Sequence, residues 1–309
     1  MKRFKNILAV GSESPNFDRV IAEAASLASR NDADLRVLGV VESSRATRRV
    51  VLYDGSELDI EGILTDSMRD ELLEAAVPFE DLAITVDVAR GRGFVEVIKA
   101  AVENDHDLVF VGTEVAKRRL AGSSMAMHLL RKCPVPVWVE NGTDEMGPDV
   151  AVAVGPFWED GDHSTLNQTL LELGSSLAAI RGGTLHVIHA WRLVGESLLR
   201  RGRARPAPEQ IDLMVVETKR RAEEDLEKLL RTIDHIDVPT EIHFEQGEPE
   251  TVVPAVLESV RPGVTVMGTL ARAGLGGVLM GNTAEYILAN TVSSVLTVKP
   301  PGFATPVEF

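Results

Sequence analysis

Cysteine is almost absent from this chain of 309 residues, because Cys133 is the only one. A single thiol excludes an intrachain disulfide and any metal site built from clustered cysteines. Its scarcity is typical of proteins kept in a reducing compartment, so we expect a cytoplasmic protein. Cys133 lies in the apolar segment LLRKCPVPVW, which predicts a small buried side chain, with a reactive thiol as the alternative.

An excess of positive charge and long apolar runs are also missing. The chain has 32 basic and 47 acidic residues, which give a formal net charge of −15 and a pI near 5.0. This acidity argues against broad nucleic-acid binding, which depends on neutralising phosphates. No stretch approaches the roughly 18 apolar residues of a spanning helix. The apolar run after the basic start MKRFKN is too short for a signal peptide. We therefore expect no membrane segment.

Clustered catalytic or metal-binding residues are not visible either. The histidines are scattered along the chain: His106, His128, His163, His186, His189, His235 and His243. His186 and His189 are three apart in a predicted strand, so their side chains point to opposite faces. We expect no metal bound directly by side chains, and Mg²⁺ only if a nucleotide carries it. No serine or threonine has an evident partner base, so catalytic residues stay unassigned.

What the sequence does contain is one pattern of strands and helices that occurs twice. In the first half, β-branched apolar runs predict strands at 6–11, 34–41, 82–89, 107–112 and 136–140. The second half predicts strands at 150–155, 184–191, 240–246, 264–268 and 294–299. Segments with helical spacing lie between them, and the polar segment 141–148 predicts a linker. These features predict two tandem α/β domains, 1–145 and 146–309, each a doubly wound parallel sheet with helices on both faces.

The segment 264–283, VTVMGTLARAGLGGVLMGNT, combines a strand, a glycine-rich loop and the start of a helix. This arrangement turns backbone N–H groups and a helix N-terminus toward an anion, and glycines let a phosphate approach closely. The alternative is a strand-to-helix connection whose glycines only make tight turns. In parallel sheets of this kind, ligands bind at the carboxyl ends of the strands, which favours the phosphate interpretation.

The spacing of this segment resembles the nucleotide signature of the universal stress protein family. That signature is a glycine, two residues, a glycine, nine residues, and a glycine followed by Ser or Thr. Here it falls on Gly268, Ala271, Gly281 and Asn282-Thr283. Together with GNTAEYIL, HLLRKCPVPVW and the late TPVE, it makes the whole chain similar to the tandem, E-type members. The resemblance implies five parallel strands in the order 3-2-1-4-5 in each half.

The resemblance also implies roles for individual residues. Gly268, Gly281, Asn282 and Thr283 would hold the phosphates, and Arg272 could add charge beside them. A solvent-facing arginine is the alternative for that position. The family implies that domains pair through their fifth strands, so 136–140 and 294–299 could join the halves as an intramolecular pseudo-dimer. Further homodimerisation stays open.

The chain departs from the family pattern at the end where the base would bind. Ala190 matches the position whose backbone meets the adenine, but Gly155-Pro156 stand where nucleotide-binding members commonly have an aspartate. Ala271 replaces the second glycine of the signature. In the first half, Gly112 is followed by a shorter loop without the final glycine spacing, so we expect that loop to be degenerate.

These observations lead to two functional hypotheses. The first is a stress-response regulatory protein that binds ATP or a related nucleotide in its second domain. The second is a binding or scaffold protein that uses the same cavity for an apolar or nucleotide-linked lipid ligand. Slow ATP hydrolysis is compatible with the loop but lacks a visible base, so the sequence does not decide whether the protein is an enzyme.

Overall fold

The computed structural model describes residues 4–11, 17–42, 50–51, 57–113, 124–141, 146–155, 162–202, 206–233, 237–269, 281–291 and 293–309. The chain forms two compact units. Unit 1 contains residues 1–144, 269–281 and 294–309, and unit 2 contains residues 145–268 and 282–293. Within the described ranges, no helix combines the length and the apolar character that crossing a membrane requires.

Unit 1 is built on a sheet of six strands, five of which are parallel. The strands are β1 (Asn6–Gly11), β2 (Asp34–Glu42), β5 (Ile84–Gly91), β6 (Leu108–Gly112), β7 (Val137–Glu140) and β12 (Ser294–Val298). Their order is β5-β2-β1-β6-β7-β12, and only β12 runs antiparallel to its neighbour, β7. The five strands of the first half thus follow the order 3-2-1-4-5. Central β1 and β6 are almost wholly buried, as their continuous apolar sequences predict.

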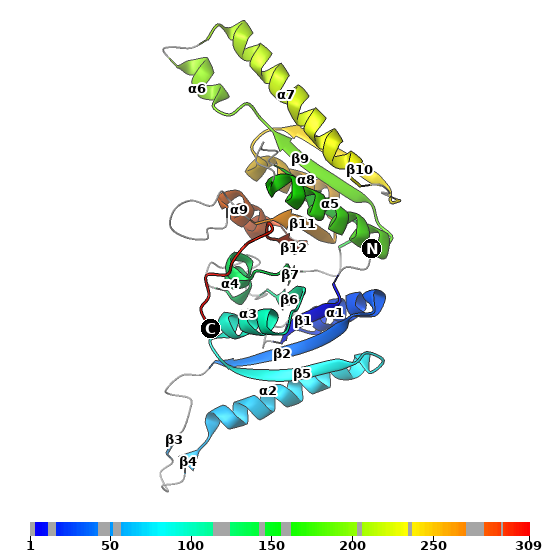
Figure 1. Cartoon of the computed structure of the whole chain (residues 1–309), viewed down its shortest axis with the longest axis vertical. Helices are drawn as coiled ribbons and strands as arrows, with labels where there is room; N and C mark the ends of the chain where they lie inside the picture. Colours follow the sequence, from blue (N-terminus) through cyan, green and yellow to red (C-terminus); the bar gives the residue numbers. More distant parts are fainter. Residues whose placement is uncertain are drawn as a thin grey trace. The chain divides into compact units, whose positions relative to one another are not determined.

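Helices lie on both faces of this sheet. They are α1 (Phe17–Asn31), α2 (Ile60–Ala76), α3 (Gly93–Glu103) and α4 (Met125–Lys132), and a short 3₁₀ turn, η1 (Val77–Phe79), follows α2. Helix α1 contacts α2. Helix α3 contacts α4, and these two helices are side by side in Figure 1. A two-stranded ribbon, β3 (Val50–Val51) with β4 (Glu57–Leu58), occurs in a segment that the sequence predicts to be an irregular loop.

Unit 2 repeats the parallel arrangement. Its strands are β8 (Val150–Ala153), β9 (Leu185–Trp191), β10 (Thr240–Gln246) and β11 (Val264–Gly268), in the order β10-β9-β8-β11. Its helices are α5 (Asp162–Arg181), α6 (Glu196–Arg201), α7 (Pro208–Arg231), α8 (Pro249–Val260) and α9 (Asn282–Asn290). Helix α5 contacts α7, and α8 contacts α9. Strand β10 ends the sheet and is largely exposed, whereas β8 and β11 are buried.

The expected pairing of the two fifth strands is present as the β7–β12 ladder of unit 1. Val139 is opposite Val295 and Trp138 is opposite Leu296. The buried Glu140 carboxylate joins the two strands, because its Oε2 accepts hydrogen bonds from Trp138 Nε1 at 3.1 Å and Ser294 Oγ at 2.9 Å. This pairing explains why residues 294–309 belong to the first compact unit. The sequence boundaries at 1–145 and 146–309 stay a prediction.

Candidate functional site

The carboxyl ends of three strands in unit 2 bring several predicted site residues to one edge of the sheet. Gly155 follows β8, Ala190 lies near the end of β9, and Gly268 ends β11. The register aligns these ends, because Ala153 pairs with both Ile188 and Met267. Gly155 is exposed, and Ala190 and Gly268 are partly exposed. Backbone groups are therefore accessible at this edge, where parallel α/β sheets bind ligands.

Helix α9 supplies a helix N-terminus after this strand end. The helix begins at Asn282, directly after Gly281. The Gly281 N–H donates to Thr269 O at 3.3 Å, so that amide already has a partner. The first N–H groups of a helix lack intrahelical acceptors and attract anions. The start of α9, rather than the Gly281 amide, is therefore the part of this segment that could receive an anion.

Gly268 is also closely packed. A Cβ at this position would lie 3.0 Å from Leu166 Cδ2 of α5, so a larger residue would require that side chain to move. This contact is a packing reason for the first glycine of the signature, separate from the tight-turn alternative, and it is compatible with a phosphate nearby. Ala271, Arg272 and Pro156 lie outside the described residues, as do the side chains of Asn282 and Thr283.

The backbone of Gly155 explains why no carboxylate stands at the end of β8. Its φ is +114°, in the region that favours glycine. A Cβ there would also lie 2.9 Å from His189 Nδ1, which is itself 3.0 Å from Val154 O. Burial lowers the pKa of His189, so the ring is neutral at pH 7. With this backbone and this neighbour, an aspartate at position 155 does not fit.

Asn167 is a further candidate site residue, for which the sequence gives no signal. This side chain on α5 is 2% exposed, and its Oδ1 accepts the Gly155 N–H at 3.0 Å. Its Nδ2 is buried and has no hydrogen-bond partner among the described residues. A buried donor without an acceptor is costly, so its position beside Gly155 makes Asn167 a candidate contact for a ligand. Nothing in the sequence distinguishes Asn167 from other helical asparagines.

Three aromatic side chains lie next to this edge of the sheet. Phe244 of β10 stacks with both His189 and Trp191 of β9, with ring centroids 5.8 Å apart in each pair. Both β9 rings are buried. They give the β9 end a rigid apolar environment beside the accessible backbone of Ala190.

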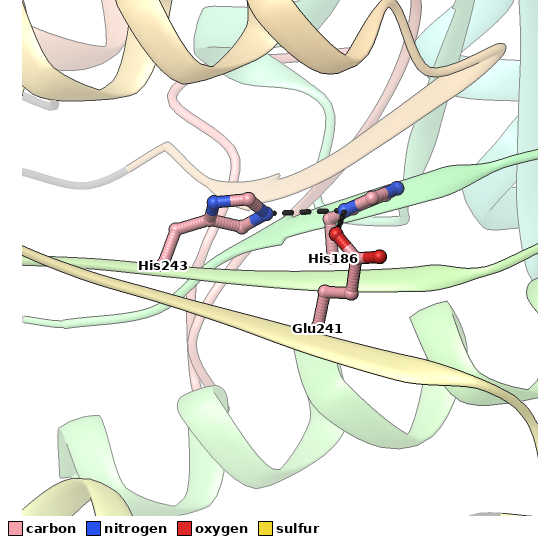
Figure 2. A group of neighbouring side chains, drawn as sticks. All are labelled: His186, Glu241 and His243. Carbon is pink, nitrogen blue, oxygen red and sulfur yellow. Dashed lines mark hydrogen bonds and ion pairs between the residues drawn. The ribbon is translucent and has the colours of Figure 1, made fainter.

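A second group of polar side chains lies at the opposite, amino-terminal ends of β9 and β10. His186, Glu241 and His243 each offer a ligand atom, and these atoms all lie within 4.8 Å of one another. Figure 2 shows the three side chains converging from two neighbouring strands. Burial and the neighbouring His186 lower the pKa of His243. Sequence spacing alone does not bring His186 and His243 together, because strand register is not visible in one sequence.

Comparisons with known proteins agree with this architecture. A model described as "Universal stress protein family" matches residues 3–139 and 161–299. Universal stress protein E of Salmonella typhi is 34% identical over 241 residues, which span 76% of this chain and 73% of that protein. Universal stress protein E of Photorhabdus laumondii is 25% identical over 319 residues, spanning 100% of this chain and 99% of that protein.

Solved structures show the same fold. A universal stress protein from Archaeoglobus fulgidus has a TM-score of 0.62 and 20% identity, and the match covers 97% of this chain and 98% of that one. A protein from Pseudomonas aeruginosa PAO1 has a TM-score of 0.68 and 23% identity, with 97% of this chain and 94% of that one covered.

Proposed function

This chain belongs to the universal stress protein family, and from that premise we propose that its second half binds ATP or a related nucleotide. The proposed site is the edge formed by the ends of β8, β9 and β11 and the start of α9. The observation that carries the proposal is the nucleotide-like spacing from Gly268 to Thr283, set between the buried strand β11 and a helix N-terminus. The proposed role is regulatory binding in a stress response.

The phosphates would lie against the start of α9. Its first N–H groups and positive dipole end attract an anion, and Gly268 leaves the end of β11 open. In this arrangement Mg²⁺ would come with the nucleotide and coordinate phosphate oxygens. The signature assigns the Thr283 hydroxyl to the same phosphates. Arg272 lies outside the signature, and we propose that it adds positive charge beside them.

The base would lie toward the ends of β8 and β9. The backbone of Ala190 would meet it, as the family signature implies. The Asn167 Nδ2 group would replace the missing carboxylate, because it is a buried donor beside Gly155 that has no partner among the described residues. A hydrogen-bond donor at this place favours a ligand that presents an acceptor atom. The aspartate that the family pattern implies would instead favour a ligand that presents a donor.

The departure at Gly155 also favours a second candidate function, the binding of an apolar or nucleotide-linked lipid ligand. Gly155 offers no carboxylate, and its conformation does not accept one. The neighbouring His189, Phe244 and Trp191 rings are suited to an apolar group. Native mass spectrometry of freshly purified protein separates the two candidates, because a nucleotide mass supports the first and an acylated mass supports the second.

Isothermal titration with Mg²⁺–ATP tests the proposal directly. Micromolar binding is expected, and Gly281→Glu should abolish it by placing a negative charge at the start of α9. Asn167→Asp keeps the oxygen that accepts the Gly155 N–H but removes the free donor. It should weaken ATP about tenfold, which corresponds to a lost hydrogen bond of ~1.4 kcal/mol. Asn290→Asp, an exposed change of the same kind at the other end of α9, should leave affinity unchanged.

Two results would contradict the proposal. The first is the absence of any heat at millimolar ATP with protein that is folded and free of other ligands. The second is equal ATP affinity for the parent chain and Gly281→Glu. Phosphate release, measured in the same samples, reports whether bound ATP is slowly hydrolysed.

A further inference from the structure

We propose that His186, Glu241 and His243 form a binding site for one divalent transition-metal ion such as Zn²⁺. The site lies at the amino-terminal ends of β9 and β10 in unit 2 (Figure 2). His186 precedes Ala190 by four residues on β9, about 13 Å along a strand at roughly 3.3 Å per residue. His243 is opposite Ile188, two residues before Ala190. The three ligands are different residues from those of the proposed nucleotide site, and their arrangement does not depend on it.

The sheet register brings the three side chains together. Strands β9 and β10 are parallel neighbours, and His186 is directly opposite Glu241. Because side chains alternate along a strand, Glu241 and His243 point to the same face of β10. His186 therefore meets a carboxylate opposite it and an imidazole on the diagonal. His189 points elsewhere and contacts Val154 O, as its spacing predicts.

Two of the three distances between ligand atoms are close to those around a metal ion, and all three are within 4.8 Å. His186 Nδ1 is 3.1 Å from His243 Nε2 and 3.5 Å from Glu241 Oε2. Ligand atoms on a tetrahedral Zn²⁺, bound at about 2.0–2.1 Å, are ~3.3 Å apart. Small rotations of the side chains would place all three atoms on one ion. Two neutral imidazoles and one carboxylate suit Zn²⁺ and its neighbours better than Mg²⁺ or Ca²⁺, which prefer oxygen ligands.

One side of this group of residues is buried in the protein, and the other side faces solvent. His186 is 5% exposed, His243 is partly exposed, and the Glu241 side chain is 64% exposed. Strand β10 is the last strand of the sheet in unit 2, so an ion can enter from solvent. Three protein ligands with an open side leave the fourth position of a tetrahedral ion to water.

Asp149 is placed as the outer partner of His186. Its Oδ2 is 3.8 Å from His186 Nε2, on the side of the ring away from the proposed ion, so a hydrogen bond between them requires the two groups to move closer when the ion binds. Its Oδ1 accepts the Thr184 N–H at 2.8 Å, which holds the carboxylate in position. Metal-binding histidines commonly direct their second nitrogen to such a carboxylate, which fixes the tautomer and raises the basicity of the ligand nitrogen. Asp149 is therefore a positioning residue in this proposal.

A metal-free explanation makes different predictions. The contact between His186 Nδ1 and His243 Nε2 is also within hydrogen-bond distance, so one imidazole can simply donate to the other. In that case Zn²⁺ would bind no better to the parent chain than to variants lacking the group. The two explanations are separated by measuring metal affinity in the whole protein.

The test is a Zn²⁺ titration of chelator-stripped full-length protein in competition with a chromophoric chelator. One ion per chain is expected, and Co²⁺ in its place should show the absorption bands of a four-coordinate site. His243→Gln and Glu241→Gln should each weaken binding by at least about tenfold. Asp149→Asn retains an oxygen for the Thr184 N–H and should cost about 10–100-fold, the usual effect of losing an outer partner.

Two control variants test whether a loss of affinity comes from removing a metal ligand or only from removing a charge or a histidine elsewhere. Glu258→Gln removes the same charge from an exposed position on α8, and His128→Gln removes a histidine from unit 1; both should keep parent affinity. Parent-like melting temperatures without metal would show that the variants fold. The proposal is overturned if the parent binds no Zn²⁺, or if Glu258→Gln weakens binding as much as Glu241→Gln does. Unchanged affinity in His243→Gln would also overturn it.

Discussion

Lys299 and Cys133 form a buried pair whose protonation should give the protein an unusual alkaline stability profile. Both belong to unit 1, where Lys299 is 8% exposed and Cys133 is fully buried. The Lys299 ammonium donates to Thr269 Oγ1 at 2.7 Å and to Leu130 O. Burial lowers the pKa of Lys299 from 10.5 to about 8 and raises the pKa of Cys133 from 9.0 to about 11. As the pH rises, we expect the two groups to change the free energy of unfolding in opposite directions.

The direction in which Lys299 changes the free energy of unfolding follows from the number of protons bound in the folded and unfolded states. Between pH 8 and 10.5 the unfolded lysine holds a proton that the folded one has lost. The unfolded chain then binds more protons, so the free energy of unfolding rises with pH. At about 1.36 kcal/mol per pKa unit, the rise across this window is about 3 kcal/mol. Below pH 8 both states are protonated, and this contribution stays at its minimum.

The titration of Cys133 changes the free energy of unfolding in the opposite direction. Between pH 9 and 11 the folded thiol keeps a proton that the unfolded one has lost. The free energy of unfolding therefore falls across that window by about 3 kcal/mol. In the parent chain the two effects should give a rise between pH 8 and 9, near-cancellation up to pH 10.5, and a fall above it.

Two single variants isolate the two effects. Lys299→Met replaces the lysine with an uncharged side chain of similar length. In this variant the free energy of unfolding should only fall as the pH rises, whereas in Cys133→Ala it should only rise. The assay is urea-induced unfolding under reducing conditions at several pH values, with each variant compared with the parent so that other titrating groups cancel. Parallel pH profiles for the parent and Lys299→Met would refute the reasoning.

Two further substitutions test the packing. Ser294→Ala removes a hydrogen bond to the buried Glu140 carboxylate, and it should lower the free energy of unfolding by about 1–3 kcal/mol in urea titrations; an unchanged midpoint would mean that the bond contributes nothing. Gly155→Asp introduces the aspartate that the family pattern implies, at a φ of +114° and 2.9 Å from His189 Nδ1. It should lower the melting temperature and not improve ATP binding, whereas Gly147→Asp, where a Cβ meets nothing within 4 Å, should be tolerated; tighter ATP binding in Gly155→Asp would contradict our account of this position.

The sequence determined the fold class because its signals are local and repeated. Continuous apolar strands such as Leu108–Gly112 alternate with amphipathic helices, and this pattern requires a parallel sheet covered on both faces. Burial of Cys133 was predicted from its apolar neighbours and is confirmed. The family was identified from glycine spacing, since spacing along the chain is fully present in the sequence. The phosphate roles of Gly268–Thr283 stay a prediction.

The tertiary structure decided everything that depends on contacts between distant segments. Register placed His186 opposite Glu241, and a shift of one residue would have turned these side chains to opposite faces. Backbone conformation gave Gly155 its positive φ and placed Asn167 beside it, although neither fact has a sequence signal. Packing joined Lys299 to the segment around Cys133. These pairings depend on long-range strand alignment and side-chain packing, which local propensity and spacing do not specify.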